Sequence, residues 1–201
     1  MIASVRCDTI DVRLEGDLGP FSASLTCVPD TTAGVFRVEL SAVAEAAAPL
    51  PDVRLAWDLP SVDFHYKWNP RCMQNRALDI AEGSYNHVDS SANSGVPVFS
   101  LYNMNGVNAC TWALSDVVHD TRTGGLYRHG TEYRCDAVVY GDGVGVTDRY
   151  DLAIRFDFRR IPYYEVLRDV AEYWERLPGC APRPVPEAAG CRSSPRGTST
   201  R

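Results

Sequence analysis

Residues 63–71, with the sequence DFHYKWNPR, hold the densest mixture of aromatic and polar side chains in the chain. Aromatic rings that pack on sugar C–H groups, beside carboxylate, amide and guanidinium groups that bind hydroxyls, are typical of a carbohydrate site. Asn69 and Pro70 place part of the segment in a loop, where binding groups concentrate. The segment therefore favours a sugar site that uses Trp68, Asp63 and Arg71.

The same segment also permits a purely structural interpretation. Phe64, Tyr66 and Trp68 alternate in the sequence, and alternate residues of a strand point to the same face of a sheet. Three rings on one face could simply pack against a core. Periodicity alone leaves both interpretations open.

Two other groups of polar residues give weaker indications of chemistry. Glycoside hydrolysis needs two carboxylates about 5–9.5 Å apart, and no spacing selects a pair, so solvated surface acids explain the candidates Asp63, Asp79, Asp89 and Asp116. Ser115, Asp116 and His119 lie close in the sequence, but the glycine pattern of a nucleophile elbow is missing. Neither pattern identifies a catalytic residue.

The cysteines indicate no metal site. The chain has 7 cysteines, an odd number, and no CxxC pair, so zinc is not expected. Cys27, Cys110 and Cys135 lie in strand-like runs, where a thiol behaves as a small buried hydrophobe.

No cofactor motif is present either. Gly141 to Gly145 contain GxGxG, but no helical pattern follows, so a loop between strands is expected instead of a phosphate cradle.

The net charge and the length of the chain exclude several classes of protein. The net charge of −6 offers no basic field for a phosphate backbone, so nucleic acid is not an expected partner. No secretory signal and no apolar run of about 18 residues is visible, so we expect a cytoplasmic protein without a membrane partner. The 201 residues are also too few for a complete (β/α)₈ barrel, which needs about 250.

The elements that must position these residues are mostly strands, because apolar and polar residues alternate along most of the chain. This alternation predicts strands at 36–42, 133–139 and 150–158, with shorter candidates at 2–7, 10–14, 21–28 and 53–58. Residues 98–102 and 108–114 flank Asn105-Gly106 and predict a hairpin. Gly124-Gly125 predicts a break between strands.

The pattern then changes to a helical one. An apolar stripe at steps of 4, 3, 4 and 3 predicts a helix that begins after Pro162 and stops at Pro178-Gly179: Tyr163, Leu167, Val170, Trp174 and Leu177. The expected fold is mainly β, an antiparallel β-supersandwich over residues 1–160, followed by an amphipathic helix at 161–178. Residues 179–201 form an irregular tail rich in proline and arginine.

Three segments together resemble one family. They are WNP continuing to NRALD at 68–79, PVFSLYN continuing through NG to TWALSD at 97–116, and RIPYYE continuing through LRDV to YW at 160–174. In this order they resemble the N-terminal domain of bacterial α-galactosidases of glycoside hydrolase family 36. The resemblance covers roughly residues 50–189.

The resemblance implies a β-supersandwich whose helix leads through a Pro-rich linker into a (β/α)₈ barrel. Both catalytic aspartates of the family lie in that barrel, so no catalytic residue is expected in this chain. It also implies that the Trp-x-Pro loop reaches toward the sugar pocket, which carries Trp68 over as a pocket-wall aromatic.

The chain departs from the family after Ala189. A permitted coding of residues 189–198, read two bases on, gives Arg-Leu-Pro-Leu-Leu-Ser-Thr-Trp-Tyr, which resembles the first barrel strand of the family. We therefore hypothesise that a one-base deletion near Gly190 produced a frameshifted tail. The neighbouring DNA tests this, since it should encode a barrel in the shifted frame.

Three functions follow. The first is the non-catalytic N-terminal domain of an α-galactosidase-like enzyme that cleaves terminal α-galactosides by a retaining mechanism, with α-galactosides and the missing barrel as partners. The second is a free-standing galactoside-binding module. The third is an oligomerisation domain, which would form a homo-oligomer through the apolar stripe of the helix.

Overall fold

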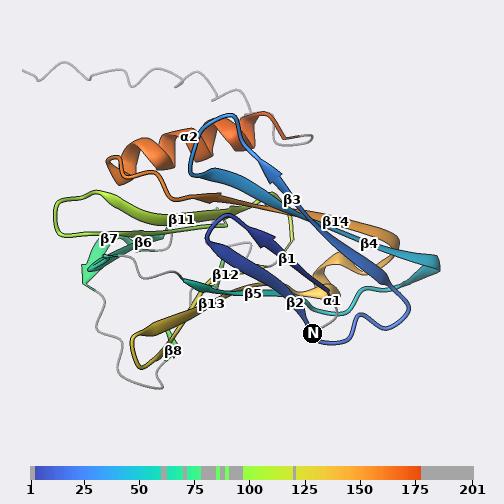
Figure 1. The fold of residues 1–201 in the computed structure, drawn as a ribbon. Helices are drawn as coiled ribbons and strands as arrows, with labels where there is room; N and C mark the ends of the chain where they lie inside the picture. The colour runs from blue at the N-terminus through green and yellow to red at the C-terminus, as the bar shows by residue number, and fades with distance from the viewer. Residues whose placement is uncertain are drawn as a thin grey trace, which may run out of the picture.

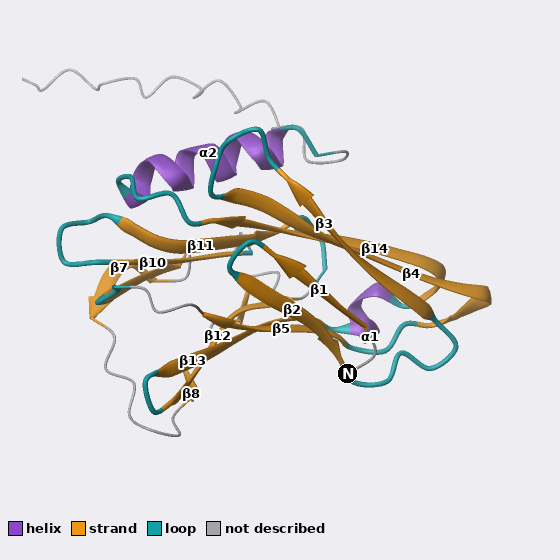
Figure 2. Cartoon of the chain, in the orientation of Figure 1, coloured by secondary structure: helices purple, strands orange, loops and turns teal. Residues whose placement is uncertain are grey.

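The computed structural model describes residues 3–59, 63–69, 72–77, 85–86, 89–90, 97–119 and 121–177. Within them, two antiparallel sheets pack face to face and one long helix covers the outer face of the second sheet (Figures 1 and 2). This arrangement confirms the mainly β sandwich with one amphipathic helix. The tail at 179–201, and with it the frameshift hypothesis, lies outside the described residues.

Sheet A is 7-stranded and contains both short N-terminal strands. Its path is β1 (Ala3–Cys7), β2 (Ile10–Glu15), β5 (Val53–Leu59), β13 (Glu132–Val139), β12 (Thr121–His129) and β8 (Tyr85–Asn86), with β9 (Asp89–Ser90) also paired to β12. Sheet B is also 7-stranded. Its order is β3 (Ser22–Pro29), β4 (Val35–Pro49), β14 (Val146–Asp157), β11 (Asn108–Leu114), β10 (Val98–Tyr102), β6 (Tyr66–Asn69) and β7 (Cys72–Ala77).

The alternating runs form the strands that their period predicts. Each of the three long runs and each of the four shorter candidates contains a strand with bounds within a few residues of the prediction, except that β4 continues to Pro49. The hairpin around Asn105-Gly106 is also confirmed as β10 and β11. Gly106 adopts a φ of 73°, a conformation that glycine reaches without steric cost.

The core lies between the two sheets and is centred on aromatic side chains from both. Trp57 of sheet A meets Trp112 and Phe156 of sheet B edge to face, with ring centroids 5.3 and 5.0 Å apart. All three side chains have 0% exposure. Because the inner face of each strand supplies every second residue, the outer faces are left for polar groups and for the helix.

Helix α2 (Tyr163–Glu175) lies across the outer face of sheet B, as Figure 1 shows. Val170 packs with Val98 and Ala113 in a second apolar cluster, and the Trp174 indole Nε1–H donates to the carbonyl of Leu114 at 2.8 Å. The apolar stripe predicted from the sequence is therefore used against the chain's own sheet.

Two glycine-rich segments differ from their predictions. β12 runs straight through Gly124-Gly125, and its pairing with β13 shifts register between Arg122 and Gly125. Glycine is tolerated in a strand where the ladder is irregular, so the expected break is wrong.

The second difference lies in the GxGxG segment, which forms a single helical turn, α1 (Gly141–Val144), instead of a plain loop. The Gly141 N–H donates to Asp52 Oδ1 at 2.9 Å, and a Cβ at Gly141 would lie 1.9 Å from the carbonyl oxygen of Leu50. The glycine is required for this close approach between two connections, and a turn this short forms no phosphate site.

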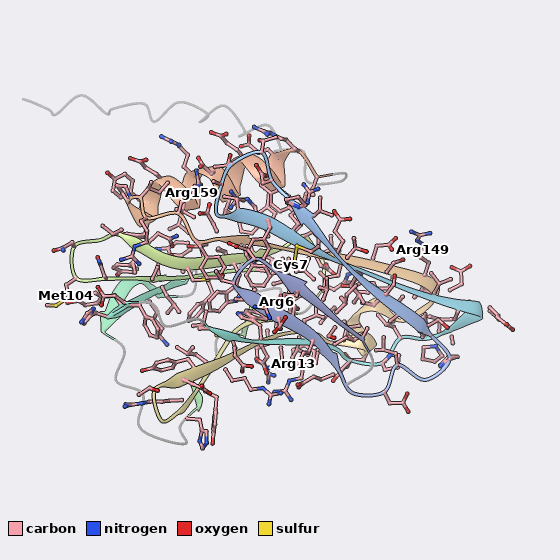
Figure 3. All side chains as sticks on the ribbon, in the orientation of Figure 1. Arg6, Cys7, Arg13, Met104, Arg149 and Arg159 are labelled. Carbon is pink, nitrogen blue, oxygen red and sulfur yellow. A yellow bond between two sulfur atoms is a disulfide. The ribbon has the colours of Figure 1, made fainter. Side chains whose placement is uncertain are left out.

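A disulfide joins the two sheets at one side of the sandwich. Cys7 of β1, in sheet A, is bonded to Cys27 of β3, in sheet B, and Figure 3 shows this bond beside the label of Cys7. The expectation of a free thiol is thus wrong for Cys27. Cys110 and Cys135 are free and buried, as predicted, and burial raises the pKa of both thiols well above the usual value.

Candidate functional site

Among the sugar-site candidates, Asp63 and Trp68 lie near the end of sheet B formed by β6 and the outermost strand β7, called here the β6 edge. Strand β6 pairs antiparallel with β10, so that Tyr66 lies opposite Tyr102 and Trp68 lies opposite Ser100. Residues directly opposite in an antiparallel pair share a face of the sheet. Tyr66 and Trp68 therefore share the outer face with α2.

Trp68 is half-buried and packs against the cluster of Val98, Ala113 and Val170. These contacts agree with the structural interpretation, in which Trp68 packs against a core, because the sheet and α2 enclose the indole on one side. Its remaining exposed surface is what a sugar could contact. Arg71 lies outside the described residues, so its place relative to Trp68 is not described.

Three tyrosines form a continuous stack at the other end of β6. The ring of Tyr102 is stacked on Tyr66 at 5.5 Å and on Tyr163, the first residue of α2, at 4.2 Å. Tyr164 meets Tyr163 at 6.1 Å and is 61% exposed. The tyrosine row of Tyr66, Tyr102, Tyr163 and Tyr164 joins β6, the β10–β11 hairpin and the helix, and it ends in an exposed ring.

The hydroxyl of Tyr102 is buried and has no hydrogen-bond partner among the described residues. Burial, followed by the charges of Tyr163 and Tyr66, raises the pKa of Tyr102 to about 12. The group is therefore a neutral phenol at any physiological pH, able to donate one hydrogen bond.

Asp63 stands beside this row and remains exposed. The Asn103 amide Nδ2 donates to Asp63 Oδ2 at 3.5 Å, and His65 Nδ1 lies 3.4 Å from Asp63 Oδ1. The other end of the Asn103 amide is fixed, because its Oδ1 accepts the N–H groups of Asn105 and Val107. The hairpin loop thus orients an amide and a carboxylate at the edge that carries the tyrosine row. Figure 3 shows Met104 at the tip of this loop.

A second polar constellation lies where β11 ends. Asp116 Oδ2 accepts the Tyr150 hydroxyl at 2.6 Å and lies 2.7 Å from His119 Nδ1, while its Oδ1 accepts the N–H groups of Val118 and His119. Burial alone would raise the pKa of Asp116, but the hydrogen bonds from Tyr150, His119 and Val118 outweigh it and hold the pKa below 3.8.

Within the part of the chain that the structure describes, this constellation includes no serine or cysteine nucleophile among its contacts. The Ser115 hydroxyl accepts the N–H of Ala153 at 2.8 Å and bonds neither His119 nor Asp116. One of the four hydrogen bonds of Asp116, from the Tyr150 hydroxyl, ties the segment after β11 to β14, and the other three hold that segment in its own turn. The structure gives Asp116 a framework role, and because its side chain is only 7% exposed, the expectation of a solvated surface acid is wrong for Asp116.

The described residues show neither a metal-binding cluster nor a membrane-spanning helix. They contain no group of three His, Cys, Asp or Glu side chains that could hold a metal ion. No helix in the described part of the chain has the length and apolar character needed to cross a bilayer.

Compared with known proteins, the chain matches no protein-family model and no curated protein.

The sequence predicts Asp63 and Trp68 as site residues but gives no sign of the contacts made by Asn103, Tyr102 and Tyr163, which are the Asn103–Asp63 hydrogen bond and the tyrosine stack. All three lie in segments whose motifs are visible, PVFSLYN and RIPYYE. Their meeting depends on the β6–β10 register and on the docking of α2, neither of which leaves a local signal in the sequence.

Proposed function

We propose that the chain is the non-catalytic β-sandwich domain of an α-galactosidase-like glycoside hydrolase. One observation supports this most directly. The helix that resembles the family's linker begins in the tyrosine row and packs on the sheet beside Trp68. The strand implied to face the sugar and the helix implied to lead to the barrel are thus one rigid unit.

In this proposal the chain shapes a sugar pocket without performing the chemistry. Trp68 offers a ring face to the apolar side of a galactose, while Asp63 and Arg71 bind hydroxyl groups. The catalytic aspartates belong to a barrel outside these residues. The cytoplasmic location expected from the sequence is part of the same proposal.

The absence of turnover is the first test. Purified chain should hydrolyse an aryl α-galactoside no faster than its Trp68→Ala variant, because a retaining mechanism needs two carboxylates across one pocket. Turnover well above that variant would overturn the proposal. Sequencing the DNA that follows the gene gives a second, independent test, since it should encode the barrel.

A free-standing galactoside-binding module is the second candidate, favoured by the exposure of Tyr164 and Asp63 at one edge. Calorimetric titration with galactose, melibiose and raffinose separates the two. A module binds saturably and loses binding on Trp68→Ala, whereas an isolated sandwich domain gives weak heat or none. An oligomerisation domain is the third candidate, and the packing of Val170, Leu167 and Trp174 on the chain's own sheet leaves less of the stripe for a second copy. Sedimentation velocity, which reports the mass of the species in solution, tests it directly.

A further inference from the structure

An open groove of about 430 Å³ lies on the outer face of sheet B, beside the C-terminal half of α2. Strands β3, β4 and β14 form its floor, and the helix contributes Tyr173 and Leu177. It is distinct from the β6 edge, since neither Trp68 nor any member of the tyrosine row lines it. Its polar lining consists of serine and threonine hydroxyls, two arginines, two carboxylates and the phenol of Tyr173.

Cross-strand pairing arranges these groups in rows. Ser41 lies between Ser24 on β3 and Asp151 on β14, so a carboxylate is aligned with two hydroxyls. In the next row Glu39 lies between Thr26 and Ala153. Each row therefore combines hydroxyl and carboxylate groups on adjacent strands, about 4.8 Å apart.

The charges in the groove cancel in pairs. Arg37 lies 3.3 Å from Glu39, and Arg149 lies 2.7 Å from Asp151. Figure 3 shows Arg149 pointing out from the sheet. The groove consequently offers many donors and acceptors without a net charge that would select an anion or a cation.

A second hollow of about 500 Å³ continues the groove along α2 and shares Arg37, Tyr173 and Leu177 with it. At this end Arg155 is 8% exposed, and its Nη1 is buried with no partner among the described residues. Its Nη2 is already used by Asp157 at 3.1 Å. A buried guanidinium nitrogen without a partner needs an acceptor oxygen.

We propose that this groove binds a neutral oligosaccharide, as a carbohydrate site separate from the β6 edge. Sugar hydroxyls both donate to carboxylates and accept from guanidinium groups, which matches paired charges of both signs. The ring of Tyr173 provides an apolar contact for a sugar face, and a sugar oxygen that reaches the hollow satisfies Arg155. The inference does not depend on the proposed function of the β6 edge.

Titration followed by amide chemical shifts tests this inference. With stachyose, a neutral tetrasaccharide, the amides of Ser41, Ala153 and Ser115 should shift saturably. Glu39→Gln should weaken binding about tenfold, the effect of losing one charged hydrogen bond. Thr26→Trp, at an exposed position of the edge strand β3, should abolish binding by filling the groove.

A matched control comes from the other sheet. Asp58 is 54% exposed and paired with Arg13 at 2.8 Å on sheet A, as Glu39 is 46% exposed and paired with Arg37 on sheet B. Asp58→Asn should leave stachyose binding unchanged, and thermal melting should show each variant folded.

Three results would overturn the inference. Shifts confined to the β6 edge and lost in Trp68→Ala would place the sugar at the edge, which would favour the galactoside module and remove the groove site. Tighter binding of trigalacturonate than of stachyose would mean that the groove selects charge. Shifts that never saturate in either sugar would mean that the groove holds no site.

Discussion

The buried carboxylate of Asp157 organises the space between sheet B and α2. It has 0% exposure and accepts from Arg155, from the Arg159 guanidinium and from the Arg159 N–H. Arg159 continues to Asp169 on the helix at 2.7 Å, and Figure 3 shows Arg159 beneath α2. Asp157 thus bonds two guanidinium groups, and Arg159, which also pairs with Asp169, connects the end of β14 to the helix.

Asp157→Asn should destabilise the fold by about 3 kcal/mol, because two buried or half-buried cations lose their shared counter-charge. Arg155→Met should cost less, about 1 kcal/mol, because Asp157 keeps Arg159. Urea unfolding of the two variants measures both costs. Equal costs would show that the carboxylate is not the centre of this network.

Asp116 is a second single residue that matters, because its contribution to the stability of the fold depends on pH. Its folded pKa lies below the 3.8 of an ordinary aspartate, so its contribution to stability is fully present above pH 4 and is lost as the pH falls through the folded pKa. Removing the Tyr150 hydroxyl brings the folded pKa closer to 3.8. The difference between wild type and a Tyr150→Phe variant should therefore shrink in acid.

Tyr150→Phe should cost about 1–2 kcal/mol at pH 7, the value of a hydrogen bond to a charged group, and clearly less at pH 3. Urea unfolding at the two pH values provides the comparison. Tyr164→Phe, at an exposed ring, is the control and should be neutral at both. A cost for Tyr150→Phe that does not change with pH would contradict the role assigned to Asp116.

At the scale of elements, α2 acts as a lid on the outer face of sheet B. Val166 and Val170 are its buried residues, and the helix starts where the Tyr163 N–H donates to Gly106 in the hairpin loop at 3.0 Å. The helix is thereby fixed at its first turn, at its centre and, through Trp174, near its end.

Val170→Asp should undock this helix, since it places an unpaired charge in the cluster with Val98 and Ala113 at a cost of about 3 kcal/mol or more. Ala171→Asp, one residue further and exposed, is the matched control. The fluorescence of Trp68 and Trp174 should shift to the red only in Val170→Asp, because both indoles pack against this cluster. A red shift of equal size in the control would argue against specific docking.

The elements were predictable where a residue's own neighbours decide its structure. Alternation found the strands at 36–42, 133–139 and 150–158, and the stripe found the helix. The predicted break at Gly124-Gly125 was wrong because a glycine pair is compatible both with a turn and with an irregular strand. Only the pairing of β12 with β13 determines which of the two forms. The same limit applies to Asp63 and Trp68, whose types suggest a site although their neighbours come from β10 and α2.

The whole molecule is organised by pairings between distant segments. β5 pairs with β13, so that Leu55 lies opposite Ala137, and β4 pairs with β14 over most of its length. Such contacts build the sandwich, but loop closure between distant segments leaves no periodic trace in a sequence. The class of fold was therefore predictable from the sequence, whereas the order of strands was not.

The Cys7–Cys27 disulfide acts at this scale, because it is a covalent connection between the two sheets. The bonded cysteines are 20 residues apart, and closing a loop of that size in the unfolded chain stabilises a protein by about 3 kcal/mol. Reductant should lower the urea midpoint of the wild type accordingly. Cys7→Ser/Cys27→Ser should have the same midpoint with or without reductant, which controls for effects of reductant elsewhere.

The Cys7–Cys27 disulfide also bears on the compartment in which the protein resides. Disulfides persist in oxidising compartments and are rare in the cytosol, so the bond and the cytoplasmic location expected from the sequence make opposite claims. Thiol alkylation followed by mass spectrometry of protein taken directly from its host decides between them. Labelling of Cys7 and Cys27 without prior reduction would show that the sandwich is held in the cell by its core alone, and unlabelled cysteines would reject the cytoplasmic location.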